Sequence, residues 1–356
     1  MAEGRRQTGA GRSVTMRDVA ERAGVGLATV SRVVNGGASV APDLADKVRE
    51  AARDLGYRHD ATASSLRRAD RRTDTVALVL EDVANPFSSA LQRAITDAAS
   101  ERGILVLSGS SDENPLRERD LVETFTARRA DGLIVVPTGR ADDALRAAQS
   151  FGTPLVAVDR MVDLTGVDTV TVDNREGTAA AAERLRAAGH RRVAYFGDQP
   201  SIWTAGERLA GFFDVFPQTP AGSVGPAGPA NAAIPVVRGL TSIEQAEQAA
   251  REALAAPEPP TAFVSGQNLI TIGIRRALQE AGLEHRIALV GFDDFPLADL
   301  LTPGVSVIAQ DPAQLGREAA SLLFARLDGY EGAARHTIVP TRYIARGSGE
   351  IPAPAG

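Results

Sequence analysis

The sequence has no cysteine, only four histidines and a single tryptophan, and these scarcities exclude several classes of protein. Without cysteine, the chain forms no disulfide and offers no thiolate to a metal ion. The histidines, at positions 59, 190, 285 and 336, fall in no metal-ligand spacing. No stretch approaches the roughly 20 apolar residues that span a bilayer, and the first twenty residues lack the apolar run of a secretory signal. We therefore expect a cytoplasmic protein with no metal site and no contact with a membrane.

Sequence motifs of common enzyme classes are also missing. There is no Gly-x-Ser-x-Gly elbow, no Gly-x4-Gly-Lys phosphate loop and no Gly-x-Gly-x-x-Gly after the first predicted strand. Asp293 and Asp294 are adjacent carboxylates, but neighbours on an extended segment point in opposite directions. The sequence therefore indicates a binding protein rather than an enzyme, and we expect no cofactor.

Charge is distributed unevenly along the 356 residues. The whole chain carries a net charge of −6, whereas residues 1–72 hold 14 Lys and Arg against 9 Asp and Glu. The remainder holds 25 basic against 36 acidic residues. A basic N-terminal segment on an acidic body is the asymmetry expected when one domain faces phosphate groups.

Residues 14–35 have the pattern of two short helices joined by a tight turn at Gly24-Val25-Gly26. The second helix would carry Val30, Val33 and Val34 on one face and polar residues, including Arg32, on the other. A short helix of this kind, held by a partner helix, fits the major groove of DNA. A third helix is predicted from Pro42 to Gly56, with Leu44, Val48, Ala51, Ala52 and Leu55 facing inward.

The rest of the chain alternates strand-like apolar runs with amphipathic helical windows, which predicts parallel sheets covered on both faces. The strand-like runs are 76–80, 104–108, 132–136, 154–158, 168–172, 192–196, 261–264, 287–291 and 305–309. The helical windows are 86–101, 116–129, 141–150, 175–188, 204–214, 242–255, 268–281 and 312–327. Nine strands are too many for one compact unit, so we predict two doubly wound lobes.

The motifs, taken together, resemble the LacI/GalR family of transcriptional repressors over roughly residues 14–345. The resemblance rests on Thr15 to Asn35, Val48, Leu55-Gly56-Tyr57, Ala63, Leu66, Asn85-Pro86-Phe87, Asp159-Arg160, Val172-Asp173-Asn174, Gly177, Ala181-Ala182, Gly189-His190-Arg191-Arg192, Arg208 to Phe212, Val290 to Asp294 and Gln310-Asp311.

This resemblance implies a domain organisation. An all-α helix-turn-helix head and an α/β body of two doubly wound parallel-sheet lobes, of the periplasmic-binding-protein type, are expected. The expected segments are a disordered arm (1–13), the DNA-binding domain (14–58), a hinge helix or linker (59–73), the two-lobed body (74–345) and a frayed tail (346–356).

The resemblance also implies a homodimer that binds a near-palindromic operator duplex. Leu27, Ala28 and Arg32 match base-facing positions, and a guanidinium can donate two hydrogen bonds to guanine. Thr29, Ser31 and Asn35 match phosphate-contacting positions, which fix register rather than sequence. The alternative is a solvated polar face on a structural helical module.

The linker is expected to form a second DNA contact. In the family it folds into a hinge helix whose leucines enter the minor groove, and here Ala63 and Leu66 match that helix. Leu66 could instead pack on the body, and the arginines at 67, 68, 71 and 72 could be a solvated charge run. His59-Asp60 replaces the Pro-Asn pair that the family more often carries.

The body is expected to bind a small-molecule effector, a sugar or sugar derivative, between its lobes and to change lobe angle on binding. The residues that match or are candidates for effector contacts are Phe87, Asp159, Trp203, Arg208, Gln267, Asn268 and Asp293. Arg208 and Asp293 suit vicinal hydroxyls, because together they donate and accept hydrogen bonds. Each has a structural alternative: an inter-lobe pair for Arg208 and Asp293, a strand cap for Asp159, and core packing for Phe87 and Trp203.

One departure from the family pattern leaves the effector open. Where the family usually carries Asn-Asp, this chain has Gly266-Gln267-Asn268. Gln267 or Asn268 could replace the missing amide, the regulator could respond to a metabolite other than a sugar, or it could be a constitutive repressor with a degenerate site. A secreted solute-binding protein would share the body fold but has no use for a DNA-binding head.

Overall fold

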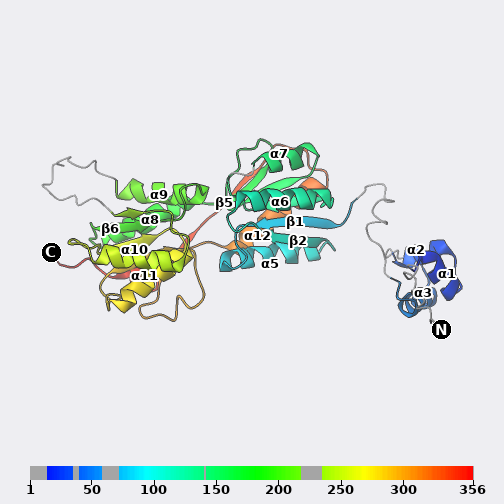
Figure 1. Ribbon diagram of the computed structural model, residues 1–356, viewed down its shortest axis with the longest axis horizontal. Helices are drawn as coiled ribbons and strands as arrows, with labels where there is room; N and C mark the ends of the chain where they lie inside the picture. The colour runs from blue at the N-terminus through cyan, green and yellow to red at the C-terminus, as the bar shows by residue number, and fades with distance from the viewer. Residues whose placement is uncertain (1–13, 35–39, 58–71, 140–141, 218–234, 356) are drawn as a thin grey trace, which may run out of the picture. The chain divides into compact units, whose positions relative to one another are not determined.

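The computed structural model describes residues 14–34, 40–57, 72–139, 142–217 and 235–355 (Figure 1). The chain divides into two units, Met1–Thr73 and Asp74–Gly356, called here the head and the body. The predictions for Asn35, Ala63 and Leu66 lie outside the described residues. Within the described part of the chain, no helix combines the length and the apolar character that crossing a membrane requires.

Three helices build the head: α1 (Met16–Ala23), α2 (Leu27–Val34) and α3 (Pro42–Asp54). Thr15 caps α1 in a capping box, since its backbone N–H donates to the Asp18 carboxylate at 2.7 Å and its hydroxyl accepts from the Asp18 N–H. Gly24 ends α1 in the left-handed region at φ 65°, a conformation that costs glycine no strain. These local signals fix the sharp turn between α1 and α2.

The core of the head is thin. It is formed by Val19, Ala20, Val30, Val48 and Ala51, with partly buried residues around them. The prediction that Leu44 faces inward is wrong: Leu44 is 39% exposed, and Ala45, the next residue on α3, is buried in its place. The buried positions 45, 48 and 51 of α3 then follow one another at three-residue spacing, which keeps them on one face.

The body contains two six-stranded sheets, which confirms the prediction of two α/β lobes. The first-lobe sheet has the strand order β11-β5-β4-β3-β1-β2, with bounds β1 (Thr75–Leu80), β2 (Leu105–Ser110), β3 (Gly132–Val135), β4 (Leu155–Val158), β5 (Asp168–Val172) and β11 (His336–Val339). The second-lobe sheet has the order β12-β10-β9-β8-β6-β7, with β6 (Val193–Phe196), β7 (Val236–Val237), β8 (Ala262–Ser265), β9 (Ala288–Phe292), β10 (Ser306–Ala309) and β12 (Arg342–Ile344).

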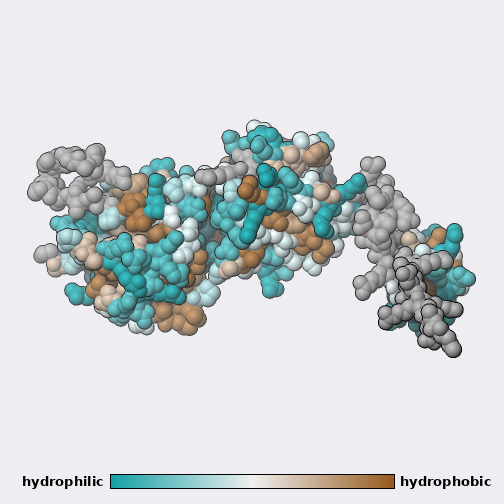
Figure 2. All heavy atoms as spheres, viewed as in Figure 1, coloured by the Kyte–Doolittle hydropathy of each residue, from teal (hydrophilic) through white to brown (hydrophobic). Residues whose placement is uncertain are grey.

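Helices cover both faces of each sheet (Figure 1). In the first lobe α5 (Pro86–Ser100) packs beside α12 (Pro312–Leu327), and α6 (Pro115–Ala127) beside α7 (Asp142–Ser150). In the second lobe α8 (Asn174–Ala187) packs beside α9 (Trp203–Val215), and α10 (Ile243–Leu254) beside α11 (Asn268–Glu280). The central strands β3 and β9 are accordingly buried along their whole length, and β1 is buried except at its first residue. Figure 2 shows hydrophilic residues over much of the visible face of the body, with hydrophobic residues in separate patches.

Three segments of chain pass between the lobes. They follow β5, β10 and β11, each of which is succeeded by an element of the other lobe. Two of them are tied together, because the Thr341 backbone N–H donates to the Asp173 carboxylate at 2.7 Å. The second crossing places the start of α12, whose N-cap is Asp311, directly after the hinge segment that contains Gln310.

The nine predicted strands and the predicted helical windows of the body are all present. Sequence reasoning missed β7, β11 and β12, which are edge strands of two to four residues whose side chains, apart from the buried Val339, are exposed or half-buried. Such short strands carry no apolar run, so periodicity does not detect them.

The segment from residue 346 to 355, expected as a frayed tail, is instead packed on the second lobe. Ser348 is 2% exposed, and its hydroxyl donates to the Leu289 carbonyl at 2.6 Å within a short 3-10 helix, η1 (Ser348–Glu350). The His190 ring, fully buried, lies 2.9 Å from the Ile351 carbonyl. These polar contacts, together with Ile351 packed against the core, hold the segment in place, and they leave no periodic hydrophobic pattern in the sequence.

Candidate functional site

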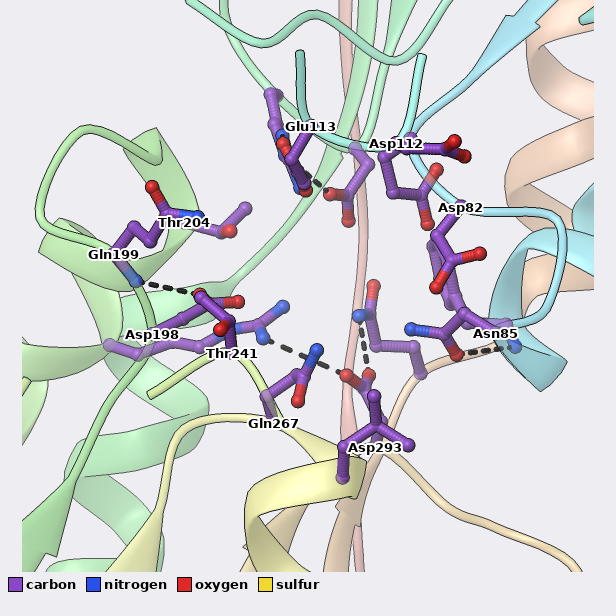
Figure 3. A pocket seen from close by; sticks show the side chains of 17 residues that line it. Asp82, Asn85, Asp112, Glu113, Asp198, Gln199, Thr204, Thr241, Gln267 and Asp293 are labelled. Carbon is purple, nitrogen blue, oxygen red and sulfur yellow. Dashed lines mark hydrogen bonds and ion pairs between the residues drawn. The ribbon is translucent and has the colours of Figure 1, made fainter. Parts of the chain in front are cut away.

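A cavity of about 400 Å³ lies between the lobes of the body, at the carboxyl ends of the parallel strands (Figure 3). Ligands of open α/β sheets bind in this position, and the volume is in the range of small-molecule sites. The lining residues are Glu81, Asp82, Asn85, Phe87, Asp112, Glu113, Asp159, Arg160, Asp198, Gln199, Thr204, Arg208, Thr241, Gln267, Leu269, Asp293 and Gln310. The lining is therefore almost wholly polar, with Phe87 as its one aromatic side chain.

Four of the lining residues hold left-handed backbone conformations. They are Asp112 at φ 50°, Glu113 at φ 55°, Asp159 at φ 70° and Asp293 at φ 67°. A non-glycine residue in this region costs of order 1–3 kcal/mol and persists where the surrounding structure over-determines it, typically at functional sites. The strand ends turn sharply at these residues, which brings their carboxylates to the cavity wall.

Arg208 and Asp293 form a buried pair on the second-lobe wall. The Arg208 Nη1 lies 3.7 Å from the Asp293 Oδ2, and both side chains are less than a tenth exposed. The same guanidinium donates to Asn174 Oδ1 at 2.7 Å and to the Gly266 carbonyl at 2.8 Å, and it lies 3.7 Å from the centre of the Phe292 ring. Asp293 also accepts a 2.6 Å hydrogen bond from Gln310, which links the cavity wall to a hinge segment.

Arg160 organises the first-lobe wall. Its Nη2 lies 2.5 Å and its Nη1 2.8 Å from the two carboxylate oxygens of Glu113, and its Nη1 also donates to the Pro137 carbonyl at 3.1 Å. Its Nε lies 3.4 Å from Asp159 Oδ2. Asp159 thus lines the cavity beside a fixed guanidinium.

Burial raises the pKa of several carboxyl groups around the cavity. The pKa of Glu81 rises to about 7, because desolvation outweighs the attraction of Arg160 and a hydrogen bond from Ser88. Burial also raises the pKa of Asp159 against the attraction of Arg160, and of Asp293 against the attraction of Arg208. Groups with perturbed pKa values in one cleft mark a candidate functional site.

Gly266, the departure from the family pattern, has a packing explanation. A Cβ atom at this position would lie 2.7 Å from the Tyr195 hydroxyl oxygen, and one at Gly197 would lie 2.7 Å from the same ring. The buried Tyr195 ring therefore occupies the space that a larger residue at 266 would need. Gln267, the next residue, lines the cavity, and its Oε1 is buried with no hydrogen-bond partner among the described residues.

Two of the predicted effector residues do not line the cavity. Asn268 is fully buried and donates a 3.0 Å hydrogen bond to Asn85 Oδ1, so it joins α11 of the second lobe to the start of α5 in the first. Trp203 is half-buried at the first residue of α9. Thr204 and Arg208, four residues apart on α9, form the helix face that reaches the cavity, and Trp203 lies outside that face.

The structure brings Phe87, Asp159, Arg208, Gln267 and Asp293 together at the cavity. Sequence reasoning missed the remaining lining residues, most of which come directly after a strand: Glu81 and Asp82 after β1, Asp112 and Glu113 near the end of β2, Asp198 and Gln199 after β6, and Gln310 after β10. The rule that ligands bind at strand carboxyl ends, applied to each predicted strand, would have found them.

In the head, Leu27, Ala28 and Arg32 are exposed on α2, with Leu27 at 48%. Thr29 and Ser31 are half-buried. Val30, on the opposite face, is fully buried against α1 and α3. Helix α2 therefore presents an exposed face that begins with Leu27 and Ala28 in its first turn and carries the Arg32 guanidinium one turn later.

Comparison with known proteins finds a family match for each of the two units, the head and the body. Residues 76–331 match the family described as periplasmic binding protein domain, and residues 15–60 match bacterial regulatory proteins, lacI family. The chain is 29% identical over 338 residues to the HTH-type transcriptional regulator KdgR of Bacillus subtilis (strain 168), covering 94% of this chain and 97% of KdgR.

Two solved structures are similar over nearly the whole chain. The lac repressor dimer bound to operator and the anti-inducer ONPF aligns with a TM-score of 0.80 at 26% identity, covering 95% of this chain and 99% of the other. The complex of the transcriptional regulator CelR with cellobiose aligns with a TM-score of 0.67 at 28% identity, covering 94% and 99%. With a helix-turn-helix head and a two-lobed body that encloses a polar cavity, this chain belongs to the LacI family of bacterial transcriptional regulators.

Proposed function

We propose that this protein is a repressor that binds a near-palindromic operator as a homodimer and is controlled by a small polyhydroxylated effector, a sugar or sugar derivative, in the body cavity. The observation that carries the proposal is the cavity itself, polar and walled by residues of both lobes. A ligand that fills it contacts both lobes at once, so it stabilises one lobe arrangement over the other. The two relatives solved with operator and with cellobiose support the two halves of the proposal.

DNA recognition is assigned to α2. Arg32 is exposed and makes no hydrogen bond or ion pair to another described residue, so its guanidinium is available to pair with the O6 and N7 atoms of guanine. Leu27 and Ala28 offer only apolar contacts, which suits thymine methyl groups. Thr29 and Ser31 are assigned to phosphate contacts, which set the register of the helix.

Arg32→Ala is expected to weaken binding to the cognate operator by about 1–3 kcal/mol, because it removes a base contact rather than a phosphate contact. The measurement is fluorescence anisotropy with a duplex from the neighbourhood of the chain's own gene, compared with a scrambled duplex at the same salt concentration. Arg119→Ala, at an exposed arginine of the body helix α6, is the matched control and is expected to change neither affinity. Equal loss on both duplexes would reassign Arg32 to a phosphate, and no loss would remove it from the interface.

A further inference from the structure

The cavity wall carries far more negative than positive charge. Seven carboxylates line it, against the two guanidinium groups of Arg160 and Arg208. Five of the seven belong to the first lobe: Glu81, Asp82, Asp112, Glu113 and Asp159. Figure 3 shows labelled carboxylates on several sides of the cavity rather than in one cluster.

Both guanidinium groups are already engaged by the protein. Arg160 is held by both oxygens of Glu113 and by a backbone carbonyl, and Arg208 by Asn174, a backbone carbonyl and Asp293. Neither is left as a free cation for a phosphate or a carboxylate of a ligand. An anionic effector would therefore face uncompensated carboxylates, at a cost that low-dielectric surroundings increase.

Three of the carboxylates form no ion pair at contact distance with a described residue, although Arg160 attracts Glu81 and both arginines attract Asp198 from further away. The Glu81 carboxylate accepts from the Ser88 hydroxyl, Asp82 from the Ala84 backbone N–H at 2.8 Å, and Asp198 from the Gln199 backbone N–H at 2.6 Å. A buried charge is normally paired. Glu81 is buried, and Asp82 and Asp198 are half-buried at the cavity wall, so all three can take a positive charge from a ligand.

Unpaired buried atoms around the cavity point to the same ligand chemistry. Four lining acceptors have no hydrogen-bond partner among the described residues: Glu81 Oε2, Asp159 Oδ1, Gln267 Oε1 and Gln310 Oε1. Glu81 and Asp159 are each only 6% exposed. The only lining donor left in this condition is Arg160 Nε. A ligand that satisfies the cavity must therefore be rich in donors, as hydroxyl and ammonium groups are.

A bare metal ion does not fit this wall. Within the described residues, no three Asp, Glu or His side chains converge closely enough to hold a metal. Calcium would need six to eight oxygen ligands around one point, whereas these carboxylates are spread over both lobes. The positive charge must therefore be part of a larger, organic molecule.

We propose that the effector is a polyhydroxylated amine, such as an aminosugar, whose ammonium group lies on the first-lobe wall beside the unpaired carboxylates Glu81 and Asp82, with Asp198 as an acceptor on the opposite, second-lobe wall. Its hydroxyl groups bind the remaining acceptors and the Arg208–Asp293 pair. The assignment rests on the proposed function, in which this cavity is the effector site. It excludes sugar phosphates and sugar acids, for which the wall offers no free cation.

Proton linkage provides an independent readout. Burial raises the pKa of Glu81 to about 7, and Arg160 and Asp159 are the charged groups that face it. An ammonium beside the carboxyl favours its ionised form, so binding of the amine releases protons near neutral pH and tightens as pH rises through 7. A neutral sugar leaves the protonation of Glu81 nearly unchanged.

The test is isothermal titration calorimetry on the full-length protein with matched probes. Glucosamine, glucose and glucose 6-phosphate form one set, the galactose analogues a second, and tris(hydroxymethyl)aminomethane with pentaerythritol a third. We expect at least one amine to bind about 10- to 100-fold more tightly than its hydroxyl parent, the effect of a one- to two-unit pKa coupling. Titrations in two buffers of different ionisation enthalpy are expected to show proton release for the amine alone.

Variants locate the charge. Asp82→Asn and Asp198→Asn each remove a charge at constant size. Asp82→Asn is expected to lose most of the amine preference, whereas Asp198→Asn, on the opposite wall, is expected to lose less of it. Asp163→Asn, at an exposed first-lobe aspartate outside the cavity, is the control and should keep the preference. Thermal melts of each variant report whether the fold is intact.

The outcomes separate this inference from the proposed function. A neutral sugar that binds as tightly as its amine and alters operator affinity would overturn the amine assignment and leave ligand control standing. Tighter binding of a phosphate, or no binding of any amine, would also overturn it. An amine that binds with the expected preference but never alters operator affinity would support the site and contradict ligand control.

Discussion

Asp293→Ala is expected to abolish the response to effector while operator binding stays within about twofold of the unchanged protein. Asp293 lies at the cavity wall, accepts from Gln310 at 2.6 Å and faces Arg208 at 3.7 Å. Removing one partner of a buried charge pair costs about 2–5 kcal/mol, much of it from the charge left behind. Effector affinity is thus expected to fall by at least about 30-fold.

The measurement is the fluorescence anisotropy of a labelled operator duplex, titrated with the protein in the presence and in the absence of effector. Asp294→Ala is the matched control, because Asp294 is the adjacent residue but pairs with Arg346 at 2.6 Å and does not line the cavity. Asp293→Asn tests the charge separately, since asparagine also tolerates the left-handed backbone at φ 67°. A normal effector response in Asp293→Ala would remove this residue from the effector site.

Val30→Asp is expected to eliminate operator binding and leave effector binding by the body unchanged. Val30 is fully buried in a core whose other buried members are Val19, Ala20, Val48 and Ala51. An unpaired carboxylate there costs several kcal/mol, more than the stability that so small a domain can lose. The body has its own core and retains its fold.

Two measurements on one preparation check this: anisotropy with the operator and calorimetry with the effector. Leu44→Asp introduces the same charge at a position that is 39% exposed on α3, and it is expected to change stability by no more than about 0.5 kcal/mol. Wild-type operator affinity in Val30→Asp would mean that the head is not the DNA-binding unit.

The fold could be predicted from the sequence because its signals are local or periodic. The capping pair Thr15 and Asp18, the glycine at the end of α1 and the apolar runs of the central strands each specify an element without reference to distant residues. The edge strand β11 could not be predicted, because it is defined by pairing with β5, more than 160 residues earlier. Leu44 was misplaced because one step along a helix turns a side chain by about 100°, and the sequence allowed either Leu44 or Ala45 to face inward.

The effector cavity was only partly predictable. Arg208 and Asp293 could be named from the family resemblance, and the structure places both on the wall. The carboxylates Glu81, Asp82 and Asp198 could not be chosen from the many acidic residues of the body, because they face one cavity only when the two lobes have folded and lie together. Asn268 was assigned to the effector, and the structure uses it between the lobes, since its amide meets Asn85 of the other lobe.

Two hydrogen bonds connect the cavity to the lobes and the hinge, which are the parts that would move. They are Asn85–Asn268 and Gln310–Asp293. The first joins the two lobes directly, and the second joins the wall to a hinge segment. A ligand bound to Asp293 and to the first-lobe carboxylates therefore acts on lobe contacts and hinge together. Such differential contact is what a ligand needs to shift a conformational equilibrium.

The most direct test of the account is the affinity of the full-length protein for a labelled duplex from its own gene neighbourhood, measured with the cavity empty and then saturated. The ligand is the compound that calorimetry shows to bind and that Asp293→Ala fails to bind. We expect specific binding in one condition and a change of about 5- to 150-fold in the other, the usual range of allosteric coupling. The account would be contradicted if the protein bound no such duplex at low salt, or if saturating the cavity with ligand left its affinity for the duplex unaltered.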